Sequence, residues 1–159
     1  MNMQVMEDGV LRDATADEID EVLARHAINL DAMKVAAIAK AYTDVDAVIG
    51  AAIGNRAEEY KDAEAAAREY LVSGGEGDAD VAVSSYAMYN PTGELQTNAW
   101  AAKQIIQRAD AFRAAQKAMR AERFARQAEM RMASTKEELA VAVDSWQGFI
   151  SNVFASLEL

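Results

Sequence analysis

The sequence contains no cysteine, and this absence excludes several kinds of chemistry at once. None of the 159 residues can form a disulfide, act as a thiolate nucleophile or supply a sulfur ligand to zinc. Proline occurs once, at Pro91, and histidine once, at His26. A single proline in a long chain rich in alanine, glutamate and arginine is typical of long helices, because proline interrupts helices more strongly than any other residue.

Long apolar runs are also missing. Although 52% of the residues are hydrophobic, many of these are alanine, and no run reaches the roughly 18 apolar residues that a membrane-spanning helix needs. The first residues lack the basic-then-apolar form of a signal peptide. We therefore expect no membrane-spanning helix, no leader and no membrane among the partners.

Candidate catalytic groups are few. His26, which we place at the end of a short helix, has no visible nucleophile beside it and is expected to cover that helix end. Paired acids such as Glu137 and Glu138 are adjacent, so their carboxylates point about 100° apart on a helix and do not converge. The segment Gly74–Gly77 lacks the Lys-Ser/Thr tail of a phosphate-binding loop. We expect no catalytic residue, no cofactor, no metal site and no enzymatic activity.

The first half of the chain predicts a β-ribbon followed by helices. Residues 3–6 and 10–12 flank Asp8-Gly9, a dipeptide that favours a tight hairpin turn. Thr15 and Glu18 match a capping box, which predicts a short helix over about 16–26. A second helical region opens near residue 29 or 31, with a bend or break at Gly50 and Gly54, and residues 55–71 follow as helix.

A glycine-rich segment separates this half from the next. Residues 73–80 predict a loop, residues 81–89 fit either a strand or one helical turn, and Asn90–Gly93 predicts a turn. A long helix is expected from Glu94 to Met132, and a second capping box at Thr135 opens the last helix. The fold class is mainly α, a helical bundle or long helical hairpins with a small N-terminal β-ribbon.

This pattern divides the chain into three regions. Residues 1–72 hold the β-ribbon and the acidic helices, residues 73–93 hold the Gly-rich loop and turn, and residues 94–159 form a helical hairpin. The boundaries are placed at the two ends of residues 73–93, because glycine and the single proline are concentrated there.

The last helix has the sharpest pattern in the sequence. Apolar side chains recur there at spacings of 4, 3, 4, 3 and 4, which is a coiled-coil heptad seam of nearly three repeats. Two phenylalanines flank it and widen the apolar face. The seam serves either the core of this domain or another chain, and both interpretations stay open. The candidate partner-binding residues are Leu139, Val143, Trp146, Phe149, Ile150, Val153, Phe154 and Leu157.

Charge is distributed unevenly along the chain. The net charge is −10, yet residues 103–136 carry 9 basic and 3 acidic side chains, whereas residues 1–80 carry 18 acidic and 7 basic ones. Pairing between these regions, within or between subunits, is the favoured interpretation, ahead of a partner protein and of nucleic acid. We expect no nucleic acid as partner. The members of this basic stripe are Lys103, Arg108, Arg113, Lys117, Arg120, Arg123, Arg126 and Arg131.

Several segments resemble, in the same order, those of small bacteriophage tail proteins. The first is the opening from Glu7 to Ile19, in which a Gly-apolar-x-Arg motif precedes Thr-x-Asp-Glu-Ile. The others, with the turn near Pro91 between them, are Glu64–Leu71, Ala109–Arg113 with its Arg-rich continuation, Ala133–Leu139 and Asp144–Ile150. Together they resemble the proteins encoded next to phage tail fibres and called tail fibre assembly proteins.

This resemblance implies a non-enzymatic chaperone or helical adaptor that binds the tail fibre or another tail protein. It implies a location in the cytoplasm of the bacterial host during assembly, in the virion tail, or in both. The chain departs from the family in having little predicted β-structure. A structural virion component, such as a helical collar or connector, therefore stays open, as do a generic helical interaction module and a homo-oligomer.

Overall fold

The computed structural model describes residues 3–7 and 9–158, without the side chains of residues 26–28. The described chain is 76% helical and carries one small β-hairpin at its N-terminal end, which confirms the expected fold class. In chain order its elements are β1 (Gln4–Glu7), β2 (Val10–Asp13), α1 (Ala16–Ala52), α2 (Ala57–Val72), α3 (Val81–Tyr89), α4 (Asn98–Met132) and α5 (Lys136–Ser156).

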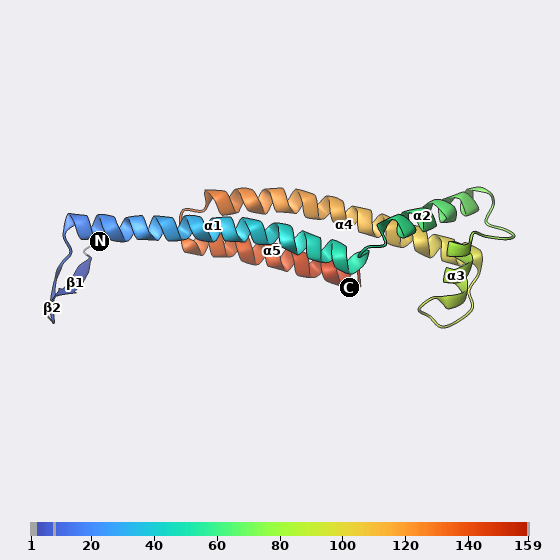
Figure 1. Ribbon diagram of the computed structural model, residues 1–159, viewed down its shortest axis with the longest axis horizontal. Helices are drawn as coiled ribbons and strands as arrows, with labels where there is room; N and C mark the ends of the chain where they lie inside the picture. Colours follow the sequence, from blue (N-terminus) through green and yellow to red (C-terminus); the bar gives the residue numbers. More distant parts are fainter. Residues whose placement is uncertain (1–2, 8, 159) are drawn as a thin grey trace.

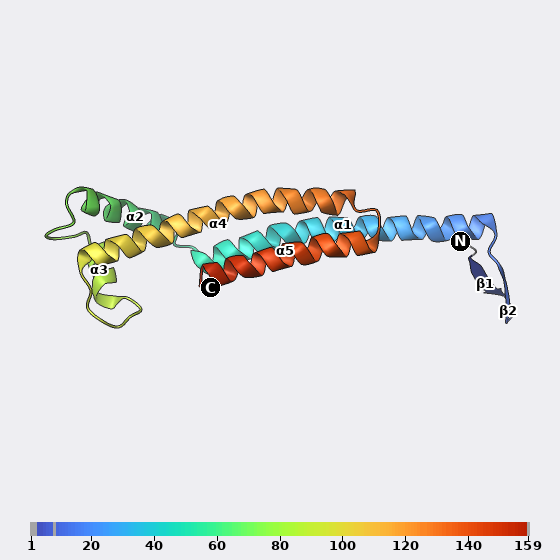
Figure 2. The same ribbon diagram turned by 180° about the vertical axis from the view of Figure 1, so that it is seen from behind.

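The molecule is an elongated rod with two buried cores (Figures 1 and 2). In the centre, α1, the C-terminal part of α4 and α5 lie side by side and bury a core that includes Val48, Met119 and Trp146. At one end, α2 and α3 pack on the N-terminal part of α4 around Ala67 and Val83. Because α4 contributes to both cores, it joins the two parts of the rod.

The N-terminal hairpin forms as the sequence predicts. β1 and β2 pair antiparallel, with Gln4 opposite Asp13 and Glu7 opposite Val10. Gly9 adopts a φ of 82°, which a two-residue hairpin turn requires and glycine tolerates, while Asp8 lies outside the described residues. Neither strand packs on a described helix. The capping box at Thr15 is present, as predicted.

Helix α1 is longer than expected. The predicted break between residues 26 and 29 is wrong, because α1 runs without interruption through 37 residues. No glycine or proline lies between residues 16 and 49, and a helix continues where nothing interrupts its hydrogen bonding. His26 therefore lies inside α1 and not at a helix end, and its side chain lies outside the described part. The break expected near Gly54 is confirmed, since Gly54 follows α1 with a φ of 52°.

In the middle of the chain, the structure decides one alternative that the sequence left open and moves one boundary. Residues 81–89 form the helix α3 and not a strand, with Asp80 accepting a hydrogen bond from the backbone N–H of Ala82 at 2.8 Å. Helix α4 begins at Asn98 and not at Glu94, because the Thr97 hydroxyl caps it. The intervening turn is held by the buried Asn90 amide, which donates to the carbonyl oxygens of residues 87 and 94 at 2.9 Å each.

Candidate protein-binding surfaces

The eight candidate partner-binding residues of the last helix, called the α5 seam from here on, lie in or against the core of this chain. Four of its side chains, at positions 139, 146, 150 and 153, are between 1% and 6% exposed. The other four, at positions 143, 149, 154 and 157, are half-buried and pack against the same core. Of the two interpretations left open by the sequence, the structure therefore supports the core. In this conformation the four buried side chains do not face a partner.

Asp44 links α1 to α5 beside this seam. One of its carboxylate oxygens, Oδ2, accepts hydrogen bonds from Nε1 of Trp146 and Nε2 of Gln147, both at 2.9 Å. The other oxygen accepts from Nζ of Lys40 at 2.6 Å. Burial alone raises the pKa of Asp44, but the three hydrogen bonds outweigh it and hold the pKa below its ordinary value. The side chain therefore stays ionised inside the bundle.

The basic stripe on α4 is partly neutralised within the chain. Arg113 donates from Nη2 to Oε1 of Glu64 at 2.7 Å, and Arg68 donates to Asp110 at 2.6 Å. These pairs connect α2 with α4. The hydrogen bonds from Arg113 and then from Arg68 lower the pKa of Glu64 to about 2. The expected pairing between acidic helices and the basic stripe is confirmed at Arg113.

The rest of the basic stripe divides into three groups. Arg126 pairs with carboxylates one turn away on α4 itself. Arg108 and Arg123 lie over the rings of Tyr86 and Tyr42, with Cζ 5.4 Å and 4.2 Å from the ring centroids. The third group has no carboxylate partner among the described residues. It consists of Lys103, Lys117, Arg120 and Arg131.

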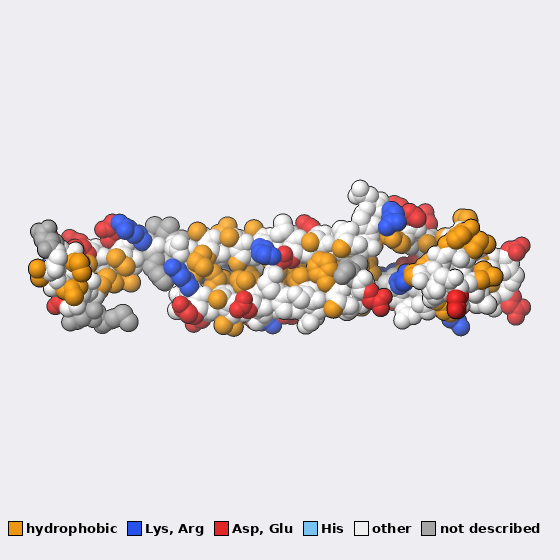
Figure 3. Space-filling view, turned by 90° about the horizontal axis from the view of Figure 1, so that it is seen from below, with side chains coloured by type: hydrophobic (Ala, Val, Ile, Leu, Met, Phe, Trp, Pro, Cys, Tyr) orange, Lys and Arg blue, Asp and Glu red, His pale blue; other side chains and the backbone are white. Residues whose placement is uncertain are grey.

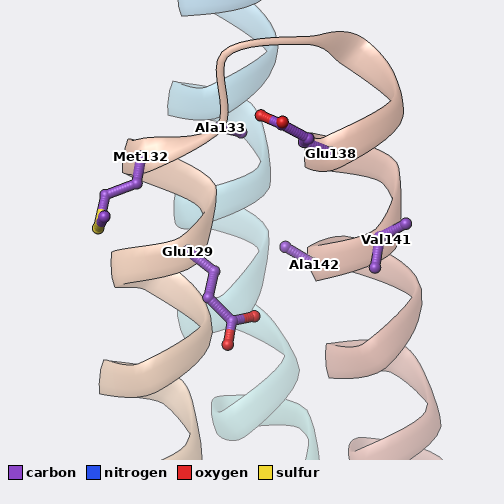
Figure 4. A pocket seen from close by; sticks show the side chains of 6 residues that line it. All are labelled: Glu129, Met132, Ala133, Glu138, Val141 and Ala142. Carbon is purple, nitrogen blue, oxygen red and sulfur yellow. The ribbon is translucent and has the colours of Figure 1, made fainter.

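Two open hollows lie on the central bundle. The first, about 370 Å³ in volume, lies between α4 and α5 at their connecting turn (Figure 4), where Met132 and Val141 are 81% and 66% exposed. The second, about 270 Å³, lies between α1 and α4. Its walls are mixed: Val45, Ile49 and Met119 are apolar, whereas Gln116, Arg120 and Arg123 add polar and cationic groups. The first hollow is also lined by Glu129 and Glu138, whose carboxylates accept hydrogen bonds from Arg126 at 2.7 Å and from the backbone N–H of Ser134 at 2.6 Å.

Exposed apolar side chains lie along the whole rod, including both of its ends (Figure 3). At the α3 end, Tyr89 and Leu95 are 80% and 79% exposed. The opposite end consists of β1, β2 and residues 16–29 of α1, called the N-terminal arm below. Leu30 is the first residue of α1 in the buried core, so the arm projects beyond the α4–α5 turn (Figure 1). Its exposed apolar side chains are those of Met6, Val10, Leu11, Val22 and Leu23.

The described residues contain no cluster of three or more acidic or histidine side chains that could hold a metal ion. None of the described helices is long and apolar enough to cross a membrane. Comparison with known proteins found no match to this chain among protein families, curated protein sequences or solved structures.

Proposed function

We propose that this protein is a non-enzymatic binding protein that contacts its partner through the N-terminal arm. The observation that carries the proposal is the arm itself, which exposes Leu11 at 61% and Leu23 at 57%. Apolar side chains that gather on a projecting segment, with none of the described elements over them, mark an interaction site more often than scattered ones do.

The β-ribbon strengthens this argument. A two-stranded ribbon is marginal in water when nothing packs on it, and neither β1 nor β2 packs on a described helix. Its side-chain tie to α1 is the ion pair of Arg12 with Glu18, which lowers the pKa of Glu18 to about 2. A partner that packs on Met6 and Leu11, which lie opposite each other in the ribbon, would complete a sheet face that the described chain leaves open.

We further propose that the partner is a phage tail fibre or another tail protein, with this chain as an assembly chaperone or a helical adaptor. The resemblance of several segments to tail fibre assembly proteins supports this assignment. The rod shape, with apolar side chains at both ends, favours an adaptor that holds two components apart. A structural collar or connector of the virion is the second candidate, favoured by the same shape.

Affinity capture from cells that assemble phage tails tests the proposal. The tagged full chain is expected to retain a tail or tail fibre protein, and Leu23→Asp is expected to lose it, because a carboxylate on the arm opposes burial of its apolar face. Val141→Asp is the matched control, since Val141 is 66% exposed on α5 of the central bundle and belongs to neither end of the rod.

The outcomes separate the parts of the proposal. Equal capture by wild type and Leu23→Asp would contradict the arm as binding surface. Capture of a protein unrelated to tails would contradict the phage assignment but would still support the arm as the binding surface. Detection of the chain in mature particles would favour the adaptor or collar over a chaperone that leaves after assembly.

A further inference from the structure

The outer side of the α1–α4 pair forms a groove that none of the described elements covers. The two helices lie side by side along the central bundle (Figure 1). Arg123 of α4 lies over the Tyr42 ring, and Gln116 of α4 lines the second hollow together with Ile49. The later α1 residue meets the earlier α4 residue, so the helices are antiparallel. This open side of the pair, away from α5, is called the α1–α4 groove below.

The α4 rim of the groove is basic. Lys117, Arg120 and Arg131 are exposed, and none of them has a carboxylate partner among the described residues. With Phe124 between them they are spaced 3, 4 and 7 along the helix, which places all four on one side of it. The helical rise from position 117 to position 131 is about 21 Å. A line of unpaired cations of this length attracts an anionic partner.

Exposed apolar side chains accompany these cations. Val35 of α1 is 69% exposed and Tyr42 is 46% exposed, and Phe124 of α4 is 55% exposed. Val45 and Ile49, which lie deeper in the groove, are half-buried and pack on the chain's own core. The surface left for a partner is therefore the rim, where apolar and basic side chains lie beside each other.

Two acids on the α1 rim distinguish between anionic partners. Asp31 precedes Val35 by four positions and Asp46 follows Tyr42 by four, so they lie on the same side of α1. Both are exposed, and neither pairs with a base of α4 among the described residues. A nucleic acid strand carries a phosphate at every nucleotide and would meet these acids as well. An amphipathic helix, in contrast, can present acids on one flank only, with an apolar face beside them.

We propose that the α1–α4 groove binds an acidic, amphipathic helix of another protein. Its apolar face packs on the exposed side chains of the groove, and its carboxylates face the α4 cations. A helix that lies in a groove between two others is a common mode of peptide recognition, and about 14 residues suffice to span the cations. The groove is separate from the N-terminal arm, so the proposal goes beyond the function proposed above and does not depend on it.

Fluorescence anisotropy of a labelled synthetic peptide tests the groove on the full chain. The peptide is three heptads long, with leucine at the a and d positions, glutamate at e and g, and alanine elsewhere. Its glutamates repel one another and oppose self-pairing. We expect saturable binding that weakens as salt screens the charges. A second peptide with serine in place of leucine is expected to bind much more weakly. Absence of saturable binding by the leucine peptide overturns the proposal.

Matched variants locate the binding. Arg120→Glu is expected to raise the dissociation constant at least about tenfold. Lys103→Glu makes the same change of charge on α4, but beside the α2–α3 core, and is expected to have little effect. Val35→Gln is expected to weaken binding, whereas Val141→Gln, on the exposed side of α5, is not. Circular dichroism verifies that each variant keeps its helix content. Equal effects of the substitutions at 120 and 103 overturn the groove as the site.

Two further measurements separate this occupant from others. A single-stranded oligothymidylate is expected not to bind. If it binds wild type and Arg120→Glu abolishes that binding, the groove is a nucleic-acid site and the helix is overturned. Sedimentation velocity of wild type is expected to show no association through the groove. A dimer that Arg120→Glu dissociates would make a second copy of the chain the occupant and would also overturn the proposal.

Discussion

Asp44 shows how one residue fixes the register of two helices. Its carboxylate accepts from Trp146 and Gln147 of α5, both at 2.9 Å, while Lys40 on its own helix neutralises the charge. The partners are separated by 102 and 103 positions in sequence. A slide of α5 along α1 by one turn, about 5.4 Å, would break both bonds.

We expect Asp44→Ala to lower the free energy of unfolding by about 1–3 kcal/mol, because the buried indole N–H of Trp146 loses its acceptor. Asp44→Asn keeps one acceptor oxygen and should cost less. Urea denaturation at neutral pH measures both. Asp46→Ala, an exposed acid on the same helix, is the control and should change stability little. Equal effects at 44 and 46 would contradict the role assigned to Asp44.

The contribution of Asp44 should also depend on pH. Its pKa in the folded protein lies below the ordinary value of 3.8, so its stabilisation is present above about pH 4 and is lost as the pH falls through the folded value. The difference between wild type and Asp44→Ala should therefore shrink in acid. Glu18 and Glu64, whose pKa values are about 2, are present in both proteins, so their effects cancel in that difference.

Local signals at single residues predicted the helix starts well. The hydroxyls of Thr15 and Thr135 both accept from the N–H three residues on, as their sequence context indicates. Thr97 caps α4 in the same way but has no acid at the third following position, so the sequence did not distinguish it. The residues next to Asp44 in the sequence do not indicate its role as an acceptor, because Trp146 and Gln147 approach it only in the folded bundle.

At the scale of elements, α5 is the helix most completely committed to the core. Its seam was predicted from spacing alone, but spacing does not say which surface the seam meets. The answer depends on which helices pack together in the folded chain. Leu30, Ala41 and Val48 of α1 lie in the same core as Trp146 and close the bundle over it.

Replacing Trp146 tests this assignment. Trp146 is 1% exposed, and truncation of a buried aromatic to alanine typically costs about 3–5 kcal/mol. We expect Trp146→Ala to lower the free energy of unfolding by that amount in chemical denaturation. Val141→Ala on the exposed side of α5 should stay within about 0.5 kcal/mol of wild type. A cost near that of the control would mean that the seam faces a partner after all.

At the scale of the whole molecule, folding pairs only some of the acidic and basic side chains that the sequence distributes unevenly. Glu64 and Asp110 neutralise Arg113 and Arg68 where α2 crosses α4. Arg120 and other cations of the stripe keep no carboxylate partner within the described chain, and the acidic arm projects away from them. A chain that separates its acidic and basic surfaces along a rod is suited to meeting charged surfaces of other molecules.

The fold class was predictable because it follows from the amino-acid composition and from the periodic spacing of apolar residues, and both can be read from the sequence. The rod shape was not, since it depends on α4 serving two cores at once. Met119 and Ala101 lie on the same uninterrupted helix, yet one packs with α1 and α5 and the other with α2 and α3. No change in the spacing of apolar residues marks the point where α4 passes from one core to the other.

The separation of arm and bundle yields the last prediction, which concerns deletion of residues 1–14. The ribbon packs on no described helix, and its ties to α1 through Arg12 involve side chains more than a third exposed. Exposed ion pairs contribute at most about 1 kcal/mol, and Thr15 keeps the helix cap. The deletion should therefore change the free energy of unfolding by less than about 1 kcal/mol while abolishing capture of the partner.

Removal of the same number of residues from the other end, 146–159, provides the contrast. That deletion takes Trp146, Ile150 and Val153 from the central core and should leave the bundle unfolded in circular dichroism. A large loss of stability on removing the ribbon would mean that it packs on the bundle in solution. If instead the shortened chain is fully stable and still captures its partner, the binding surface lies elsewhere, and the exposed apolar side chains around Tyr89 at the α3 end become the surface to test.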